Sequence, residues 1–157
     1  MKLKELVEQY GEYTVPQELI EKLEKPQPKT VWDLERGDRH CWVDITGAIC
    51  TDVKWRDDEE DKLSRAMGYV FLTEEEANRE VERRRVETLL LKYGGRRWLK
   101  KDDGNYYMRV NTYGSLIISC TLVGTQGVIY FDTKEQAQNA IDEIGTERIK
   151  RALFEVR

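Results

Sequence analysis

Apolar positions in the first thirty residues follow the spacing of a helix. They recur three or four residues apart at Leu3, Leu6, Val7 and Tyr10, and again at Leu19, Ile20 and Leu23. Gly11 ends the first run, and Pro26 and Pro28 end the second. The pattern predicts an N-terminal helical extension over residues 1–29, whose last residues form a linker.

The rest of the chain repeats one pattern of strands and helix. Residues 44–49 resemble residues 111–116, and residues 69–77 resemble residues 129–137. Each copy opens on a tryptophan and continues with a hairpin, a third strand and a helix that begins at a capping box. The first copy also holds an inserted acidic stretch, residues 56–63.

The position of glycine in each hairpin fixes the expected register. A three-residue turn with glycine in its last, left-handed position places Val43 opposite Ile49, and Val110 opposite Leu116. In the first hairpin, Val53 and Trp55 then share the apolar face of Val43. This alternation predicts that each strand pair has one apolar and one polar face.

Glycines also mark where the longer helices end. Gly94 and Gly145 follow the last apolar positions of the two helices, and Thr146 is placed to cap a final helix. We predict an α+β fold made of two tandem ββ-β-α units of antiparallel sheet, with helices packed on one face. The first unit spans residues 30–95, and the second unit, with its C-terminal helix, spans residues 96–157.

Composition argues against a membrane-spanning protein. Of the 157 residues, 39% are hydrophobic and 36% are charged, and the formal net charge is −4. The longest apolar stretches are far shorter than the ~20 residues of a spanning helix. The N-terminus resembles neither a signal nor a transit peptide, and three cysteines without a CxxC pair indicate a reducing compartment. We therefore expect a cytoplasmic protein.

One set of residues has the components of a catalytic site. The predicted register places Asp52 opposite His40, the only histidine, with Cys50 diagonal to it on the same face. A thiol, an imidazole and a carboxylate can form an activated nucleophile, and with Asp44 they are also potential metal ligands. Because Cys50 lies in mid-strand, where nothing favours a thiolate, we interpret the set as a passive cross-strand pair. We predict no catalytic site, no cofactor and no metal.

Two groups of residues are candidates for binding a protein partner. Trp42 and Tyr107 occupy matching positions on the polar sheet faces, and Tyr130 lies near them. Such rings can anchor a protein interface, stack on unpaired bases, or pack within or between copies of the chain. The second group is an acidic loop or short helix that could meet a basic partner surface. It comprises Asp57, Asp58, Glu59, Glu60 and Asp61.

Basic residues form a third candidate site, for nucleic acid. They lie in the middle of the long helix and in the segment that follows it: Arg83, Arg84, Arg85, Arg96, Arg97, Lys100 and Lys101. Clustered cations neutralise phosphates, although Glu80 can also pair with Arg84 one helical turn later. The group indicates either a solvated helix face or a phosphate-binding stripe.

Three segments of the first unit form a recognisable pattern. They are Trp32-Asp33-Leu34 with Gly37-Asp38, Trp42-Val43-Asp44 with Gly47 and Trp55, and Gly68-Tyr69-Val70-Phe71-Leu72-Thr73-Glu74-Glu75-Glu76-Ala77. The pattern resembles a module of small accessory proteins of phages and prophages of Gram-positive bacteria, over residues 31–93 and more loosely over residues 98–155. The resemblance implies a mobile-element protein. Proteins of this kind include inhibitors of host defence, among them anti-CRISPR proteins, which commonly act by occupying a nuclease surface without catalysing a reaction.

We therefore expect a non-enzymatic phage or prophage protein that binds a host protein, such as a nucleic-acid-guided nuclease, and inhibits or modulates it. The alternative is a nucleic-acid-binding protein that uses the basic stripe for phosphates and Trp42 and Tyr107 for stacking. In either case we expect the chain to act in the bacterial cytoplasm, without membrane contact, as a monomer or a homodimer.

Overall fold

The computed structural model describes residues 28, 30–98, 105–125 and 127–155. In chain order the elements are the 3-10 helix η1 (Val31–Asp33), β1 (Arg39–Val43), β2 (Ile49–Lys54), α3 (Glu59–Ala66), β3 (Val70–Phe71), α4 (Glu74–Lys92), β4 (Asn105–Val110), β5 (Leu116–Thr121), β6 (Tyr130–Phe131), α5 (Lys134–Ile144) and α6 (Thr146–Phe154). Except for residue 28, the predicted N-terminal extension lies outside the described residues, as do Lys100 and Lys101.

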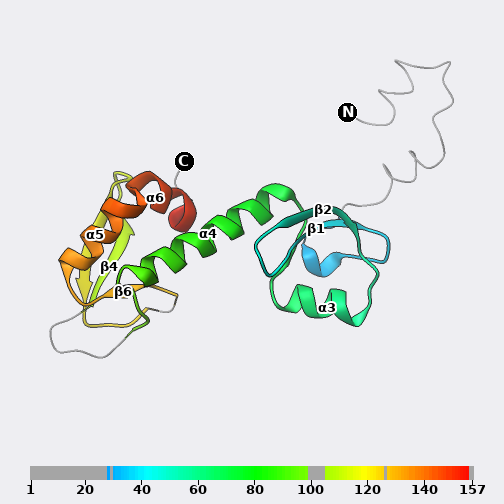
Figure 1. Cartoon of the computed structure of the whole chain (residues 1–157), viewed down its shortest axis with the longest axis horizontal. Coiled ribbons are helices and arrows are strands. Elements are labelled where there is room, and N and C mark those ends of the chain that lie inside the picture. Colours follow the sequence, from blue (N-terminus) through cyan, green and yellow to red (C-terminus); the bar gives the residue numbers. More distant parts are fainter. Residues whose placement is uncertain (1–27, 29, 99–104, 126, 156–157) are drawn as a thin grey trace, which may run out of the picture.

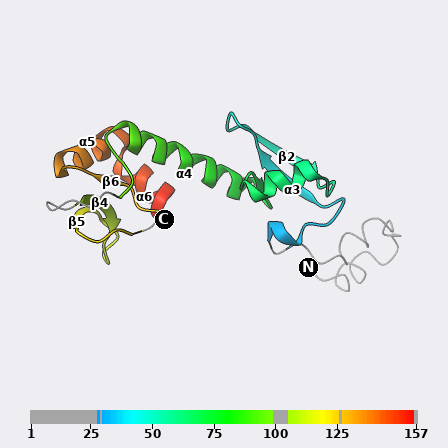
Figure 2. The ribbon, with the colours of Figure 1, turned by 90° about the horizontal axis from the view of Figure 1, so that it is seen from below.

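The chain folds into two small antiparallel sheets joined by one long helix. The strand order is β2-β1-β3 in the first sheet and β5-β4-β6 in the second. Each sheet belongs to a lobe at one end of α4 (Figure 1), and the same two lobes are separate in the view from below (Figure 2). The predicted α+β fold of two units, each with three strands followed by a helix, is confirmed.

Hydrogen bonds at the turns and helix starts confirm the internal repeat. In the first hairpin turn, Asp44 Oδ1 accepts two backbone N–H groups at 2.7 and 2.9 Å. In the second, Asn111 Oδ1 accepts the two equivalent N–H groups, both at 2.9 Å. At the starts of α4 and α5, the Thr73 and Thr133 hydroxyl oxygens accept equivalent backbone N–H groups, both at 3.2 Å. The repeated residues therefore build the same local structures twice.

Both predicted registers are correct next to the turn. Val43 lies opposite Ile49, and Val110 lies opposite Leu116. In the second hairpin this register continues along both strands to Asn105.

The first register is wrong beyond Cys50, because a β-bulge follows it. Asp52 has a φ of 62°, and the bulge shifts the pairing so that His40 lies opposite Val53. One extra residue in a strand reverses which side chains face each way beyond it. Trp55 therefore lies on the opposite face from Val43, where it is fully buried.

The helix after each third strand packs on one face of its sheet, as predicted. Ala77 and Val81 of α4 pack with Cys41 and Val43 of β1. In the second lobe, α5 packs on the equivalent face, together with α6 and the later turns of α4. α6 begins directly at Thr146 with Gly145 as its N-cap, so the predicted capping role of Thr146 is wrong.

The first lobe also covers the other face of its sheet. η1 and the inserted helix α3 lie on that side (Figure 1), and Leu34, Trp55 and Val70 form a second buried cluster there. The inserted stretch thus adds a layer that the second lobe does not contain among its described residues.

Candidate protein-binding surface

The aromatic residues predicted to bind a partner are largely covered. Tyr130 is 1% exposed, and Trp42 and Tyr107 are half-buried. Trp98 meets the edge of the Tyr130 ring at a centroid distance of 5.3 Å, and the backbone N–H of Thr125 donates to the Tyr130 hydroxyl at 2.8 Å. The expectation that Tyr130 lies on an open sheet face is therefore wrong, since neighbouring chain segments fold back over it.

The predicted acidic group divides into structural and exposed residues. Asp58 caps α3 by accepting the backbone N–H of Asp61 at 2.9 Å. Asp61 is itself buried, and its carboxylate accepts the backbone N–H groups of Arg56 and Asp57. The Arg56 guanidinium also lies within 3.4 Å of carboxylate oxygens of Asp58, Glu60 and Asp61. The exposed carboxylates of the group are those of Asp57, Glu59 and Glu60, each with a cation of Arg56 or Lys62 nearby.

The three parts of the candidate nucleophile are not brought together. Asp52 forms an ion pair with Arg39 and does not face His40. His40 is 4% exposed, and its ring meets the edge of Trp55 at a centroid distance of 5.6 Å. Burial lowers the pKa of His40, although the Asp61 carboxylate and the Val53 carbonyl act in the opposite direction. Cys50, by contrast, is exposed.

The basic stripe is split between the two lobes. On α4, Arg83 pairs with Glu80 and Glu87, and Arg84 pairs with Glu80. The hydrogen bond to the Glu80 carboxylate is the main reason that the pKa of Arg83 is raised, and Glu87 adds to it. At the edge of the second sheet, Arg96 pairs with Asp132 at 2.7 Å, and Arg97 is exposed next to it. The described cations therefore do not form one continuous phosphate-binding surface.

α3 packs on the body of the protein with its polar side. Asp61 is the one buried residue among the eight of this helix. One turn later, the Arg65 guanidinium carbon lies 4.7 Å from the centroid of the Trp55 ring, and Arg65 also donates to the Val31 carbonyl. Cation–π contact and a charged helix cap thus hold α3 in place where apolar packing usually would.

The apolar side of α3 faces away from the body. Leu63 is 64% exposed and Met67, which caps the helix, is 59% exposed. Trp32 of η1 is 65% exposed and stacks on the same Arg65, at 4.8 Å from its guanidinium carbon. We refer to Trp32, Leu63, Ala66 and Met67 as the α3 surface. Its orientation is the reverse of that of an ordinary surface helix, which buries its apolar side.

Local hydrogen bonds fix Trp32 in this position. The Thr30 hydroxyl accepts the Trp32 N–H at 3.2 Å, and the Asp33 carboxylate accepts the Thr30 N–H at 2.9 Å. This capping box orders the backbone of η1, and the indole packs on the Arg65 guanidinium, so binding through Trp32 would order little additional structure.

Sequence analysis did not identify the α3 surface. Leu63 and Met67 are four residues apart, so their shared helix face is readable from the sequence. Which side of α3 faces the body is not readable, because it depends on Trp55 reaching this side of the sheet through the bulge at Asp52.

No protein-family model, curated protein or solved structure matches the chain. Within residues 28–155, leaving out the gaps given above, no group of three His, Cys, Asp or Glu side chains is arranged to hold a metal ion. None of the described helices is both long and apolar enough to cross a membrane.

Proposed function

We propose that this protein binds a partner protein through the α3 surface and catalyses no reaction. The single observation that carries the proposal is the outward apolar side of α3, together with the exposed Trp32 that stacks on Arg65 of the same helix. Leu63 and Met67 lie four residues apart on one helix face, and exposed apolar clusters of this kind are typical of interaction sites. Tryptophan is also the residue type most enriched among those that dominate binding energy.

Charge around the α3 surface favours a partner with a basic rim. The stretch from Arg56 to Lys62 has five carboxylates and two cations, and Glu59 and Glu60 are highly exposed. A complementary partner has an apolar depression for Trp32 and lysine or arginine side chains around it.

The resemblance to phage accessory proteins supplies the class of partner. We propose a host protein that this chain inhibits or modulates in the bacterial cytoplasm, with a nucleic-acid-guided nuclease as the specific case. The nucleic-acid groove of such an enzyme is basic, which matches the carboxylates around the α3 surface. Occupation of that groove would inhibit the nuclease without chemistry.

Capture from a lysate of a phage-susceptible host tests the proposal. The tagged protein, a Leu63→Asp/Met67→Asp variant and a Trp32→Ala variant are compared with and without nuclease treatment. We expect one host protein to be retained after nuclease treatment, to be lost with the double variant, and to bind the Trp32→Ala variant more weakly by at least about 2 kcal/mol.

Exposed apolar residues of the second lobe provide matched controls. Tyr113→Ala and Leu122→Asp/Val123→Asp change side chains that are 91%, 65% and 73% exposed. These variants should retain the partner. Equal loss in both sets, or capture that persists in the α3 variants, would disprove the role of the α3 surface.

Nucleic acid is the competing partner. If bound material disappears on nuclease treatment, and if affinity for a short oligonucleotide falls steeply with salt, the alternative replaces the proposal. In that case Arg97→Gln should reduce the salt slope by about 1, as expected for one lost phosphate contact.

A further inference from the structure

A second site lies between the two lobes, on the other side of the first sheet from the α3 surface. It is a cleft of about 610 Å³ between the first hairpin turn, α4 and α6, with Tyr69 at one end. This volume lies within the ~300–1,000 Å³ typical of small-molecule sites. We refer to it as the arginine cleft, after Arg84, Arg85 and Arg148, which line it.

Two of these arginines are held by glutamates on α4. Arg84 Nε donates to Glu80 at 2.7 Å, and its NH2 group donates to the Gly68 carbonyl at 3.0 Å. Arg148 of α6 donates through Nε to Glu82 at 2.6 Å. Neither glutamate lines the cleft. These contacts use one edge of each guanidinium and leave other N–H groups available.

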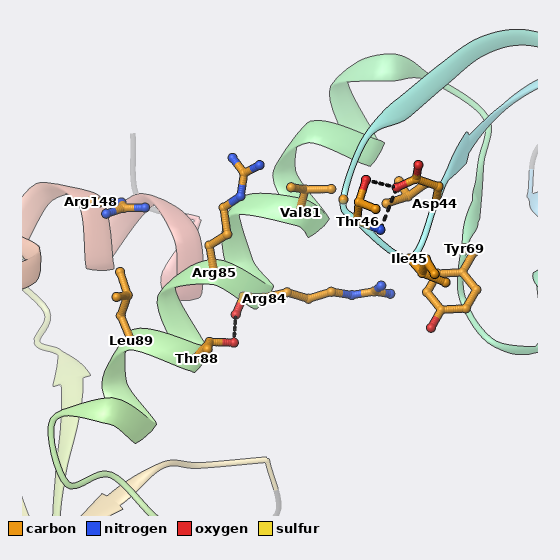
Figure 3. A pocket seen from close by; sticks show the side chains of 12 residues that line it. Asp44, Ile45, Thr46, Tyr69, Val81, Arg84, Arg85, Thr88, Leu89 and Arg148 are labelled. Carbon is orange, nitrogen blue, oxygen red and sulfur yellow. Dashed lines mark hydrogen bonds between the residues drawn. The ribbon is translucent and has the colours of Figure 1, made fainter.

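Figure 3 shows how the three side chains enter the space. Arg84 reaches from α4 toward Tyr69 and the hairpin, Arg148 lies on the α6 side, and Arg85 rises from α4 between them. The guanidinium carbon of Arg84 lies 5.2 Å from the centroid of the Tyr69 ring, which further fixes its direction.

Among the described residues, Arg85 is the cation of the cleft without an ion-pair partner. It forms no ion pair with any residue that the structure describes, and it is exposed. Glu82, which lies one turn before Arg85 on α4, is already bonded to Arg148.

Among the described residues that line the cleft, Asp44 is the one with a carboxylate, and the turn occupies it. Asp44 Oδ1 accepts the Thr46 hydroxyl and the backbone N–H groups of Thr46 and Ala48, at 2.7 to 2.9 Å. These donors, the Thr46 hydroxyl foremost, lower the pKa of Asp44. Asp44 therefore maintains the turn, and it does not neutralise the arginines by direct pairing.

The remaining lining is mixed, since Thr46, Thr88 and Tyr69 stand beside apolar side chains. Val43, Val81 and Leu89 line the cleft, and the fully exposed Ile45 stands at the hairpin tip beside it. The Arg85 and Arg148 guanidinium groups, next to this apolar surface, match a molecule with a charged phosphate at one end and a flat apolar body at the other.

We propose that the arginine cleft binds a small phosphorylated ligand of nucleotide size. The phosphate lies against Arg85 and Arg148, and the base or another planar group covers Val81 and Leu89. The site is independent of the α3 surface, since the two lie on opposite faces of the first sheet.

Titration of the full chain with inorganic phosphate, AMP, ATP and GTP tests the proposal. We expect saturable binding of at least one nucleotide by calorimetry, with methyl NMR shifts at Val43, Val81 and Leu89. Inorganic phosphate should bind more weakly, because it lacks the apolar body.

Arg85→Gln is the decisive variant, because it removes a charge that supports no other contact among the described residues. It should weaken nucleotide affinity about tenfold, the loss expected for one charge-assisted hydrogen bond. Arg97→Gln, an exposed arginine in the other lobe, should leave affinity unchanged.

Three outcomes would overturn the proposal. The first is the lack of saturable shifts at the three methyl-bearing residues with every probe. The second is an equal loss of affinity in Arg85→Gln and Arg97→Gln. The third is affinity that appears only with oligonucleotides and rises with their length, which would indicate a nucleic-acid-binding surface.

Discussion

The two lobes share their local structure but cover the open faces of their sheets differently. In the second lobe, the segments around Trp98 and Thr125 fold over the sheet, and aromatic rings pack edge to face on Tyr130. In the first lobe, the separate helix α3 takes this place, held by Arg65 and Asp61. A cover made by an added helix has an outer side, and that side is where the apolar α3 surface lies.

The difference between the lobes begins with the first residue of the third strand in each sheet. Val70 lies opposite Trp42, and Tyr130 lies opposite Tyr107. The smaller valine leaves space on the open face, and the bulge at Asp52 brings Trp55 into it. Equivalent positions in a repeat can thus hold different side chains, provided that another part of the chain fills the volume.

Phenylalanine at the second position of each third strand gives the largest expected contrast. Phe131 is fully buried, whereas Phe71 is half-buried. Phe131→Ala should destabilise its lobe by about 3–5 kcal/mol, the usual cost of a large cavity, and Phe71→Ala should cost about half as much. Urea denaturation followed through backbone amide signals of each lobe measures both losses.

The test also shows whether the lobes unfold together. Because α4 contributes Val81 to one core and Val86 to the other, strong coupling would transmit the Phe131→Ala loss to amides of the first sheet. Equal losses for the two variants in their own lobes would contradict the packing contrast.

Much of the fold was predictable because it depends on local interactions. The turns follow from Gly47 and Gly114, which have φ values of 84° and 77°, and the helix starts follow from Thr73 and Thr133. Each of these residues acts on backbone groups within a few positions, so the sequence alone contains the information.

The α3 surface was not predictable, because it depends on tertiary packing. The amphipathic pattern of α3 favours burial of Leu63 and Met67, and the structure exposes both. What reverses the helix is Trp55, whose face changes through a positive φ at Asp52. Nothing in the local sequence marks that bulge, since aspartate adopts this conformation only occasionally.

The second contrast between the lobes concerns a buried polar position, which makes the stability of the first lobe depend on pH. His40 and Asn105 lie two residues before Trp42 and Tyr107, and both are buried. Because burial lowers the pKa of His40, the unfolded chain binds a proton at a pH where the folded chain does not. The first lobe should therefore lose stability as pH falls below about 6.5, by at most about 1.4 kcal/mol per pH unit.

Asn105 occupies the position in the second lobe that corresponds to His40, so His40→Asn serves as the control. We expect His40→Asn to lower stability at neutral pH and to remove the part of the pH dependence that lies between the two pKa values of the histidine. Denaturation of both proteins at pH 5, 6 and 7 measures the change in stability and in its pH dependence. An unchanged pH profile in this variant would show that groups other than His40 cause the acid sensitivity.

The smallest contrast lies in the capping boxes, which differ by one charge. Glu76 accepts the N–H groups of Leu72 and Thr73 at 3.1 and 3.3 Å, and Gln136 accepts the equivalent pair at the same two distances. A negative charge at a helix N-terminus stabilises by about 0.3–1 kcal/mol. Gln136→Glu should thus stabilise the second lobe, and Glu76→Gln should destabilise the first by a similar amount, in low-salt denaturation experiments. High salt should reduce both effects, whereas changes in stability that do not respond to salt would mean that hydrogen-bond geometry, and not charge, separates the two caps.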